Sequence, residues 1–175
     1  PTNTSTSTPT PTPTSGPVLT NLVLYYDPSN PLSYSGSGTV LNDLSGNNLT
    51  GTLSATTFTD PYFTYNGTNS TTYTADNSLL EPSSGDFTVE IWVNQSVFSG
   101  SSRVLIGKTD TGLASGWGYG LRTNSAGATY FEVGNGTTSL TSPSYTATTN
   151  TWYQIVGVWT NIASNSIALY VNGNS

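Results

Sequence analysis

Alternating apolar residues, separated by glycine-containing turns, constrain the fold of this chain more than any other feature. Within residues 86–94, DFTVEIWVN, the odd-numbered positions are apolar and most even-numbered positions are polar. A period of two is typical of a strand that buries one face. Residues 152–159 and 166–171 have the same β-branched and aromatic composition. No window has the spacing of an amphipathic helix, so the sequence predicts an all-β, antiparallel fold.

Shorter strands and tight turns complete this pattern. Asn-Gly pairs at 66–67, 135–136 and 172–173 supply the positive φ of hairpin turns. Many short strands joined by such turns favour a two-sheet jelly-roll sandwich. On the strand within 86–94 we expect Phe87, Val89, Ile91 and Val93 to be buried, with Thr88 and Glu90 more exposed. Further strands are expected at residues 22–26, 62–65, 71–75, 104–107, 119–123 and 130–134.

The first seventeen residues differ from the remainder in composition. Residues 1–17, PTNTSTSTPTPTPTSGP, offer no apolar side chain for a core. Alternating Pro and Thr favour an extended polyproline II conformation. We therefore expect a linker or stalk over residues 1–17 and a folded domain over residues 18–175. A plain spacer and an O-glycosylated stalk fit the composition equally well.

Charge and composition exclude several classes of function. Arg103, Lys108 and Arg122 are the three basic residues, against nine acidic ones, and the net charge is −6. Binding to nucleic acid or to an anionic membrane surface needs more positive charge. No apolar run approaches the ~20 residues of a spanning helix, so no membrane insertion is expected. The absence of Cys and His excludes thiol and histidine nucleophiles, disulfides and zinc sites built on those residues.

A series of short motifs follows in a recognisable order. They are LYYD, NPLSYSGSGT, NDLSGNN, GTL, YNGTN, FTVEIWV, YGLR, TWYQIVG and LYVNG, between residues 24 and 173. In this order they resemble the laminin-G-like jelly rolls of the concanavalin A-like lectin/glucanase superfamily, in particular those of viral and phage structural proteins and secreted microbial proteins. The resemblance covers roughly residues 20–173. It is more specific for the fold than for a ligand, because the superfamily includes lectins, enzymes and structural modules.

Asp43 is the weak calcium candidate of this chain. Residues 43–47, DLSGN, predict a turn in which Asp43 hydrogen-bonds its own backbone. The resemblance implies that related domains often hold a structural calcium ion near such loops, and Asp43 is the nearest carboxylate. Asn66 and Asn69 are neutral where relatives often carry acidic residues. This departure weakens the expectation of calcium, and no other cofactor is expected.

The acidic residues do not form a catalytic pair. The resemblance includes laminarinase-like glucanases, which carry a Glu-x-Asp-x-x-Glu strand. Glycoside hydrolysis needs two carboxyl groups roughly 5–9.5 Å apart on one face. Glu90 is alone on its strand, and Glu81 is separated from Asp86 by a proline and a Ser-Gly turn. We therefore expect a protein without enzymatic activity.

A candidate sugar site lies in residues 115–124, SGWGYGLRTN, where Trp117 and Tyr119 are flanked by glycines. Aromatic platforms and neutral hydrogen-bonding groups suit sugars, and glycines let a ligand approach closely. Tyr130 and Asn135 join this site if residues 117–135 form a hairpin. Capping of the sandwich edge by Trp117 is the alternative, and the sequence does not choose between them.

The remaining strand aromatics are expected to serve the fold. Trp92 and the adjacent Trp152 and Tyr153 lie in predicted strands. Because aromatic side chains bury large areas, we expect core or sheet-face packing there rather than ligand contact.

The pattern for N-glycosylation also recurs. Because the chain is rich in Asn, Ser and Thr, chance alone accounts for its frequency, and the pattern matters only in a host that glycosylates extracellular proteins. The candidates in the predicted domain are Asn48, Asn66, Asn69, Asn94 and Asn135.

Two functions from different classes follow. The first is a lectin-like module, outside a cell or on a cell or virion surface, that serves adhesion or contact with host glycans. The second is a structural subunit of a capsid decoration, fibre or filament, whose partner is protein. Glycans or neighbouring copies in a surface assembly are thus the expected partners.

The C-terminal turn predicts a missing strand. A turn at residues 172–173 implies a returning strand, yet the sequence stops at Ser175. The resemblance implies further strands, so we expect the domain over 18–175 to be C-terminally incomplete. Strands 22–26 and 166–171 would then have open edges, completed by later residues or by a neighbouring subunit.

Overall fold

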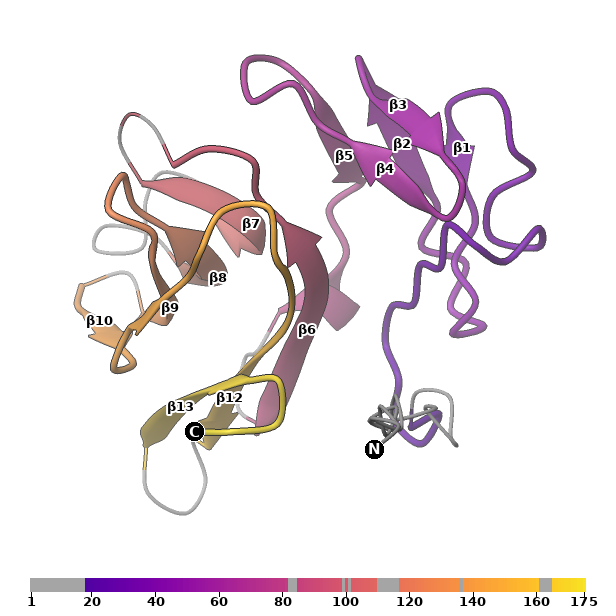
Figure 1. Cartoon of the computed structure of the whole chain (residues 1–175). Helices are drawn as coiled ribbons and strands as arrows, with labels where there is room; N and C mark the ends of the chain where they lie inside the picture. The colour runs from indigo at the N-terminus through magenta and orange to yellow at the C-terminus, as the bar shows by residue number, and fades with distance from the viewer. Residues whose placement is uncertain are drawn as a thin grey trace, which may run out of the picture. The chain divides into compact units, whose positions relative to one another are not determined.

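The computed structural model describes residues 18–175 except 82–84, 99, 101, 110–116, 136 and 161–164, and describes Thr109, Trp117 and Asn135 by their backbone alone. The expected linker at residues 1–17 lies outside the described residues. The chain divides into two compact units, Pro1–Asn77 and Ser78–Ser175 (Figure 1).

The first unit consists of a small sheet and a hairpin around an aromatic cluster. Tyr34, Leu41 and Leu53 are buried, and the Tyr34 ring lies 4.9 Å from Phe58 and 5.0 Å from Phe63. Phe58 and Phe63 are paired across the hairpin, so one cluster joins it to the sheet. The sheet has the order β1 (Val40–Leu41), β2 (Gly51–Ser54), β5 (Thr71–Thr74), and the hairpin is β3 (Thr57–Thr59) with β4 (Tyr62–Thr64).

The strand expected at residues 22–26 is absent, and this prediction is wrong. The Tyr25 amide donates to Asp43 Oδ1 at 2.9 Å, and the Tyr25 carbonyl accepts from the Leu44 amide at 2.9 Å. The Val23 carbonyl accepts from Ser45 Oγ at 2.8 Å and from Asn47 Nδ2 at 2.9 Å. Groups of the 43–47 turn therefore satisfy the backbone that a β ladder would use.

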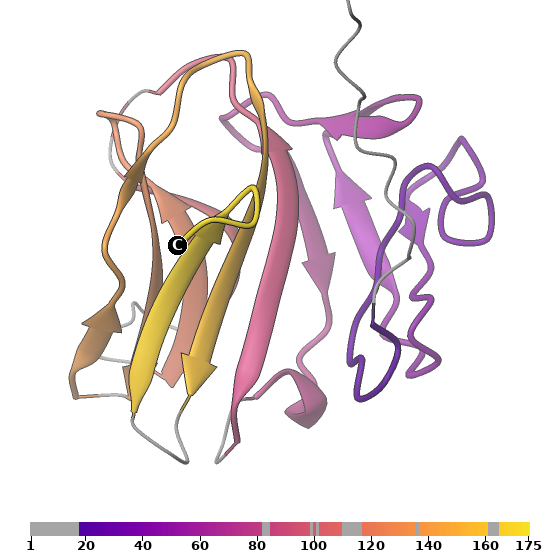
Figure 2. The same ribbon diagram turned by 60° about the horizontal axis from the view of Figure 1, so that its bottom comes forward.

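The second unit contains two antiparallel sheets. Figure 2 shows β13, β12 and β6 side by side, with β12 in the middle. The other sheet has the order β10-β9-β8-β7, and β11 also pairs with β9. The all-β, antiparallel expectation is confirmed. The elements are η1 (a 3-10 turn, Ser78–Leu80), β6 (Phe87–Asn94), β7 (Arg103–Thr109), β8 (Trp117–Thr123), β9 (Ala128–Asn135), β10 (Ser139–Thr141), β11 (Tyr145–Thr146), β12 (Trp152–Thr160) and β13 (Ser166–Val171).

The core of the second unit draws on both sheets. Leu121, Phe131 and Val133 come from β8 and β9, and Ile155, Trp159, Leu169 and Val171 come from β12 and β13. The odd-numbered residues Phe87–Val93 of β6 are half-buried against this core, whereas Thr88 and Glu90 are exposed. The predicted alternation of β6 is therefore confirmed.

Close packing at the core fixes the residue type of one β12 position. A Cβ added to Gly157 would lie 2.6 Å from Cδ2 of Phe131, a side chain with no solvent exposure. We expect Gly157→Ala to lower the free energy of unfolding by about 1–3 kcal/mol through overpacking. Urea denaturation followed by tryptophan fluorescence measures this change. Gly85→Ala is the control, because a Cβ at Gly85 meets no atom within 4 Å. Equal stability of the two variants would contradict this packing.

Candidate functional site

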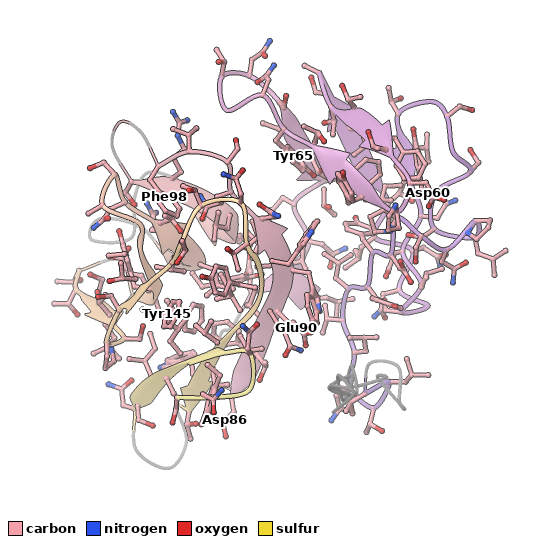
Figure 3. The ribbon with its side chains drawn as sticks, in the orientation of Figure 1. Asp60, Tyr65, Asp86, Glu90, Phe98 and Tyr145 are labelled. Carbon is pink, nitrogen blue, oxygen red and sulfur yellow. The ribbon has the colours of Figure 1, made fainter. Side chains whose placement is uncertain are left out.

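One sheet of the second unit presents a continuous surface on the side away from the core. The even-numbered residues of β6 point away from the core, and the register aligns them with alternate residues of β12 and β13. Figure 3 shows Glu90 on this side of β6, with Asp86 just before the strand. We call this surface the outer sheet face. It consists of Thr88, Glu90, Trp92, Asn94, Trp152, Gln154, Val156, Val158, Ala168, Tyr170 and, in the turn after β13, Asn172.

Three large aromatic side chains are exposed on the outer sheet face. The exposed fractions are 60% for Trp92, 44% for Trp152 and 36% for Tyr170. Of the two placements expected for Trp92 and Trp152, core or sheet face, the structure shows the sheet face, whereas Tyr153 is buried in the core, at 7% exposure. The physical reason is the alternation of side chains along a strand. Both tryptophans occupy outward positions, while Phe87 and Trp159 fill the interior. The alternation in β6 already placed Trp92 beside Glu90, but the size of the ring argued for burial.

The register places the two tryptophans close together. Trp92 lies opposite Gln154, and Trp152 lies opposite Asn94. Trp92 and Trp152 are therefore diagonal neighbours on adjacent strands, about 7–8 Å apart and within reach of one ligand. Tyr170 lies opposite Val156 on the third strand, so the aromatic positions extend over the whole width of the sheet.

Polar groups lie between these rings and are held in place. Gln154 Nε2 donates to Glu90 Oε1 at 2.7 Å. The backbone amide of Gln154 donates to Asn172 Oδ1 at 3.0 Å, and the backbone amide of Asn172 donates to the backbone carbonyl of Gln154 at 2.9 Å. The face thus combines flat apolar rings with oriented amide and carboxylate groups. Such a face suits a ligand that has both apolar surfaces and hydroxyl groups.

The β8–β9 hairpin, which carries the residues selected from sequence, has the expected pairing. Trp117 is the backbone partner of Asn135, and Tyr119 is the partner of Val133. The Tyr119 ring lies 4.9 Å from that of Phe87 at the core. Burial raises the pKa of Tyr119, and the nearby Lys108 charge opposes this shift.

Tyr130 lies on the other face of this hairpin. Its partner is Arg122, which follows the core residue Leu121 and so points to the opposite side. The Tyr130 hydroxyl lies 2.9 Å from Ser102 Oγ. Tyr119 and Tyr130 therefore do not converge on one surface. The side chains of Trp117 and Asn135 lie outside the described residues, so their role in sugar binding stays a prediction.

The Asp43 carboxylate is occupied by protein donors. Oδ1 accepts from the Tyr25 and Ser45 amides at 2.9 and 2.8 Å, and Oδ2 accepts from Ser45 Oγ at 2.7 Å and the Leu49 amide at 3.1 Å. Burial favours the neutral acid, but the hydrogen bonds from Ser45, Tyr25 and Leu49 outweigh it and hold the pKa of Asp43 below its usual value. With its lone pairs taken by four donors, Asp43 organises the turn and does not fit a calcium ligand.

The glycosylation candidates lie in different surroundings. Asn48 and Asn94 are exposed, and Asn94 belongs to the outer sheet face. Asn66 Oδ1 accepts from the Thr68 and Asn69 amides at 2.9 and 3.1 Å, and Asn66 Nδ2 donates to Asn69 Oδ1 at 2.8 Å. These bonds tie Asn66 and Asn69 into one loop. Glycosylation at these four positions, and at Asn135, stays a prediction.

The described part of the chain contains neither a cluster of metal ligands nor a membrane-spanning helix. Among its Asp and Glu side chains, no three are close enough together to hold a metal ion. In the same residues, no helix has the length and apolar character needed to cross a membrane.

One family model matches the chain. It is of the laminin G type, is described as the concanavalin A-like lectin/glucanases superfamily, and covers residues 66–175. The matched range contains β5 and the whole second unit, including the outer sheet face. No curated protein and no solved structure is significantly similar to the chain.

The Asp43 turn gives a pH-dependent prediction. An Asn at this position has one acceptor oxygen instead of two, so Asp43→Asn should lower the free energy of unfolding by about 1–2 kcal/mol at pH 7. Because folding lowers the pKa of Asp43, its stabilisation is complete above the unfolded pKa of about 3.9 and is lost as pH falls through the folded pKa.

Thermal unfolding between pH 7 and pH 2 measures both effects. The difference between the original chain and Asp43→Asn should shrink as pH falls below about 4. Asp27→Asn is the control, because Asp27 Oδ1 caps the exposed Ser29 turn and should contribute less. A difference that stays constant down to pH 2 would contradict this role of the carboxylate.

Proposed function

The chain belongs to the concanavalin A-like lectin/glucanase superfamily, and we propose that it is a non-enzymatic carbohydrate-binding module whose ligand lies on the outer sheet face. One observation carries this proposal. Trp92, Trp152 and Tyr170 are exposed on a single sheet face. Gln154 is held between them by Glu90, which accepts from its side-chain amide, and by Asn172, which accepts from its backbone amide.

Physical chemistry supports a sugar as the ligand of such a face. An exposed indole ring gains free energy when an apolar surface covers it, at roughly 25 cal/mol per Å² removed from water. The flat C–H face of a pyranose provides this surface, while its hydroxyl groups need hydrogen-bonding partners. The side chains of Gln154, Glu90 and Asn94 offer both donors and acceptors next to the rings.

The carboxylates support binding rather than hydrolysis. Glu90 is the one carboxylate among the residues of the outer sheet face, and a glycosidase of the common type needs two. Glu132 lies 3.3 Å from Arg122, and Glu81 lies 3.3 Å from Lys108. Each of these two carboxylates is therefore engaged by a cation in the other sheet.

The setting that we propose is outside a cell or on the surface of a cell or virion, where such a module serves adhesion or contact with host glycans. The Pro/Thr composition of residues 1–17 supports display on a stalk. A structural role with a protein partner is the second candidate. The feature that favours it is β13, which in the described part of the chain pairs with no strand other than β12, because an edge strand can accept a partner's strand.

Replacing the exposed tryptophans tests the proposed site. We expect Trp92→Ala and Trp152→Ala each to weaken glycan binding about tenfold or more, the equivalent of ~1.4 kcal/mol, because each removes a stacking surface. A glycan array followed by affinity electrophoresis measures the effect. Tyr73→Ala is the matched control, since Tyr73 is an aromatic residue of the first unit with 63% exposure.

The competing hypotheses predict different results in the same assay. Binding that is lost in Trp117→Ala but kept in the Trp92 and Trp152 variants would move the site to the β8–β9 hairpin. No binding to any glycan, together with an ordered protein interface in the native assembly, would favour the structural subunit.

A further inference from the structure

We propose that the outer sheet face binds several consecutive sugars of an uncharged oligosaccharide chain and rejects sulfated or carboxylated glycans. This inference rests on the proposed function and specifies its ligand class. Two features carry it, namely the distribution of charge over the chain and the arrangement of the three aromatic positions.

All positive side chains lie away from the outer sheet face. Arg103 and Lys108 are in β7 and Arg122 is in β8, so β6, β12, β13 and the entire first unit contain no Lys or Arg. The sulfate or carboxylate groups of acidic glycans are recognised chiefly by Arg and Lys. The outer sheet face therefore has no cation to offer such a group, however the two units are arranged.

The ionisable side chain at the centre of the face is instead an anion. Glu90 accepts from Gln154 Nε2 through Oε1 and is exposed, and Asp86 immediately precedes its strand. A second negative charge brought within about 4 Å of Glu90 is repelled enough to weaken binding fivefold or more, even at the dielectric constant of water. A sugar hydroxyl, by contrast, donates favourably to a carboxylate oxygen. The charge on this face is complementary to a neutral, hydroxylated ligand.

The arrangement of the aromatic positions indicates a chain rather than a single sugar. Tyr170 lies opposite Val156, four residues along β12 from Trp152. With about 3.4 Å per residue and about 4.8 Å between strands, Trp152 and Tyr170 are ~14 Å apart along a diagonal of the sheet. Trp92 lies beside this diagonal, level with Gln154. One hexose ring does not extend over this distance, so several consecutive sugars are needed to cover the three rings.

Affinity electrophoresis in native gels tests the ligand class with matched polymers. The matched probes are hydroxyethyl cellulose against carboxymethyl cellulose, and dextran against dextran sulfate. Galactomannan, xyloglucan and xylan are further neutral probes, and heparin is a further anionic probe. We expect retardation by at least one neutral polymer, loss of it in Trp92→Ala and Trp152→Ala, no retardation by the anionic polymers, and little change between 50 and 500 mM NaCl. Tyr73→Ala again serves as the control.

Chain length is tested by calorimetry with oligosaccharides of the polymer that binds. Affinity should rise at least tenfold from the monosaccharide to the tetrasaccharide. Equal affinity for the monosaccharide would overturn the proposed chain-binding mode. The variant Glu90→Lys, which places a cation at the centre of the face, tests the role of charge. Retardation by dextran sulfate should appear in this variant and be absent from the original chain.

The outcomes separate this inference from the proposed function. Tryptophan-dependent binding to heparin or dextran sulfate, stronger than to neutral polymers, would keep the carbohydrate-binding function and overturn the ligand class. No tryptophan-dependent retardation by any polymer would overturn both. Concentration-dependent self-association that is lost in Trp92→Ala would identify a second copy of the chain as the occupant and would also overturn the inference.

Discussion

The packing of Phe131 against the backbone of Gly157 determines which side of β12 is buried. The ring of Phe131 occupies the space that a side chain at position 157 would need. Tyr153, Ile155 and Trp159 share this side and form the core. Since side chains alternate along a strand, Trp152 and Gln154 must then point outward. The composition of the candidate site is thus a consequence of how the core is packed.

The pairing register of β12 aligns the neighbouring strands β6 and β13. β12 is paired with β6 over its whole length up to Trp159 and with β13 from Ile155 onward. A shift of one residue in either ladder would exchange the inner and outer residues of that strand. Trp92, Gln154 and Tyr170 therefore share a surface only because both ladders are fixed by the half-buried residues of β6 and by Leu169 and Val171 of β13. Stability and the geometry of the outer sheet face depend on the same contacts.

Sequence patterns predicted the long strands of the second unit, β6, β7, β8, β9, β12 and β13, because alternation there is strong and local, but they missed the short strands β10 and β11. They failed at residues 22–26, where hydrogen bonds from Asp43, Ser45 and Asn47 replace a strand partner. These bonds join positions about twenty residues apart, which no local pattern contains. At the site, composition selected the glycine-flanked Tyr119, yet the structure packs this ring against Phe87. For Trp92, the alternation of side chains along the strand indicates the outer face, whereas the size of the ring favours burial. The three-dimensional structure shows that the ring is exposed on the outer face.

The proposed function requires that the ligand contacts the two exposed tryptophans of the outer sheet face. The four indole N–H signals of the chain in a ¹⁵N NMR spectrum, from Trp92, Trp117, Trp152 and Trp159, report directly on this claim. In a titration with a neutral tetrasaccharide, the signals of Trp92 and Trp152 should shift. The signal of Trp159, a core residue whose Nε1 donates to Asn165, should not. A titration in which Trp117 shifts while Trp92 and Trp152 stay in place would contradict the account.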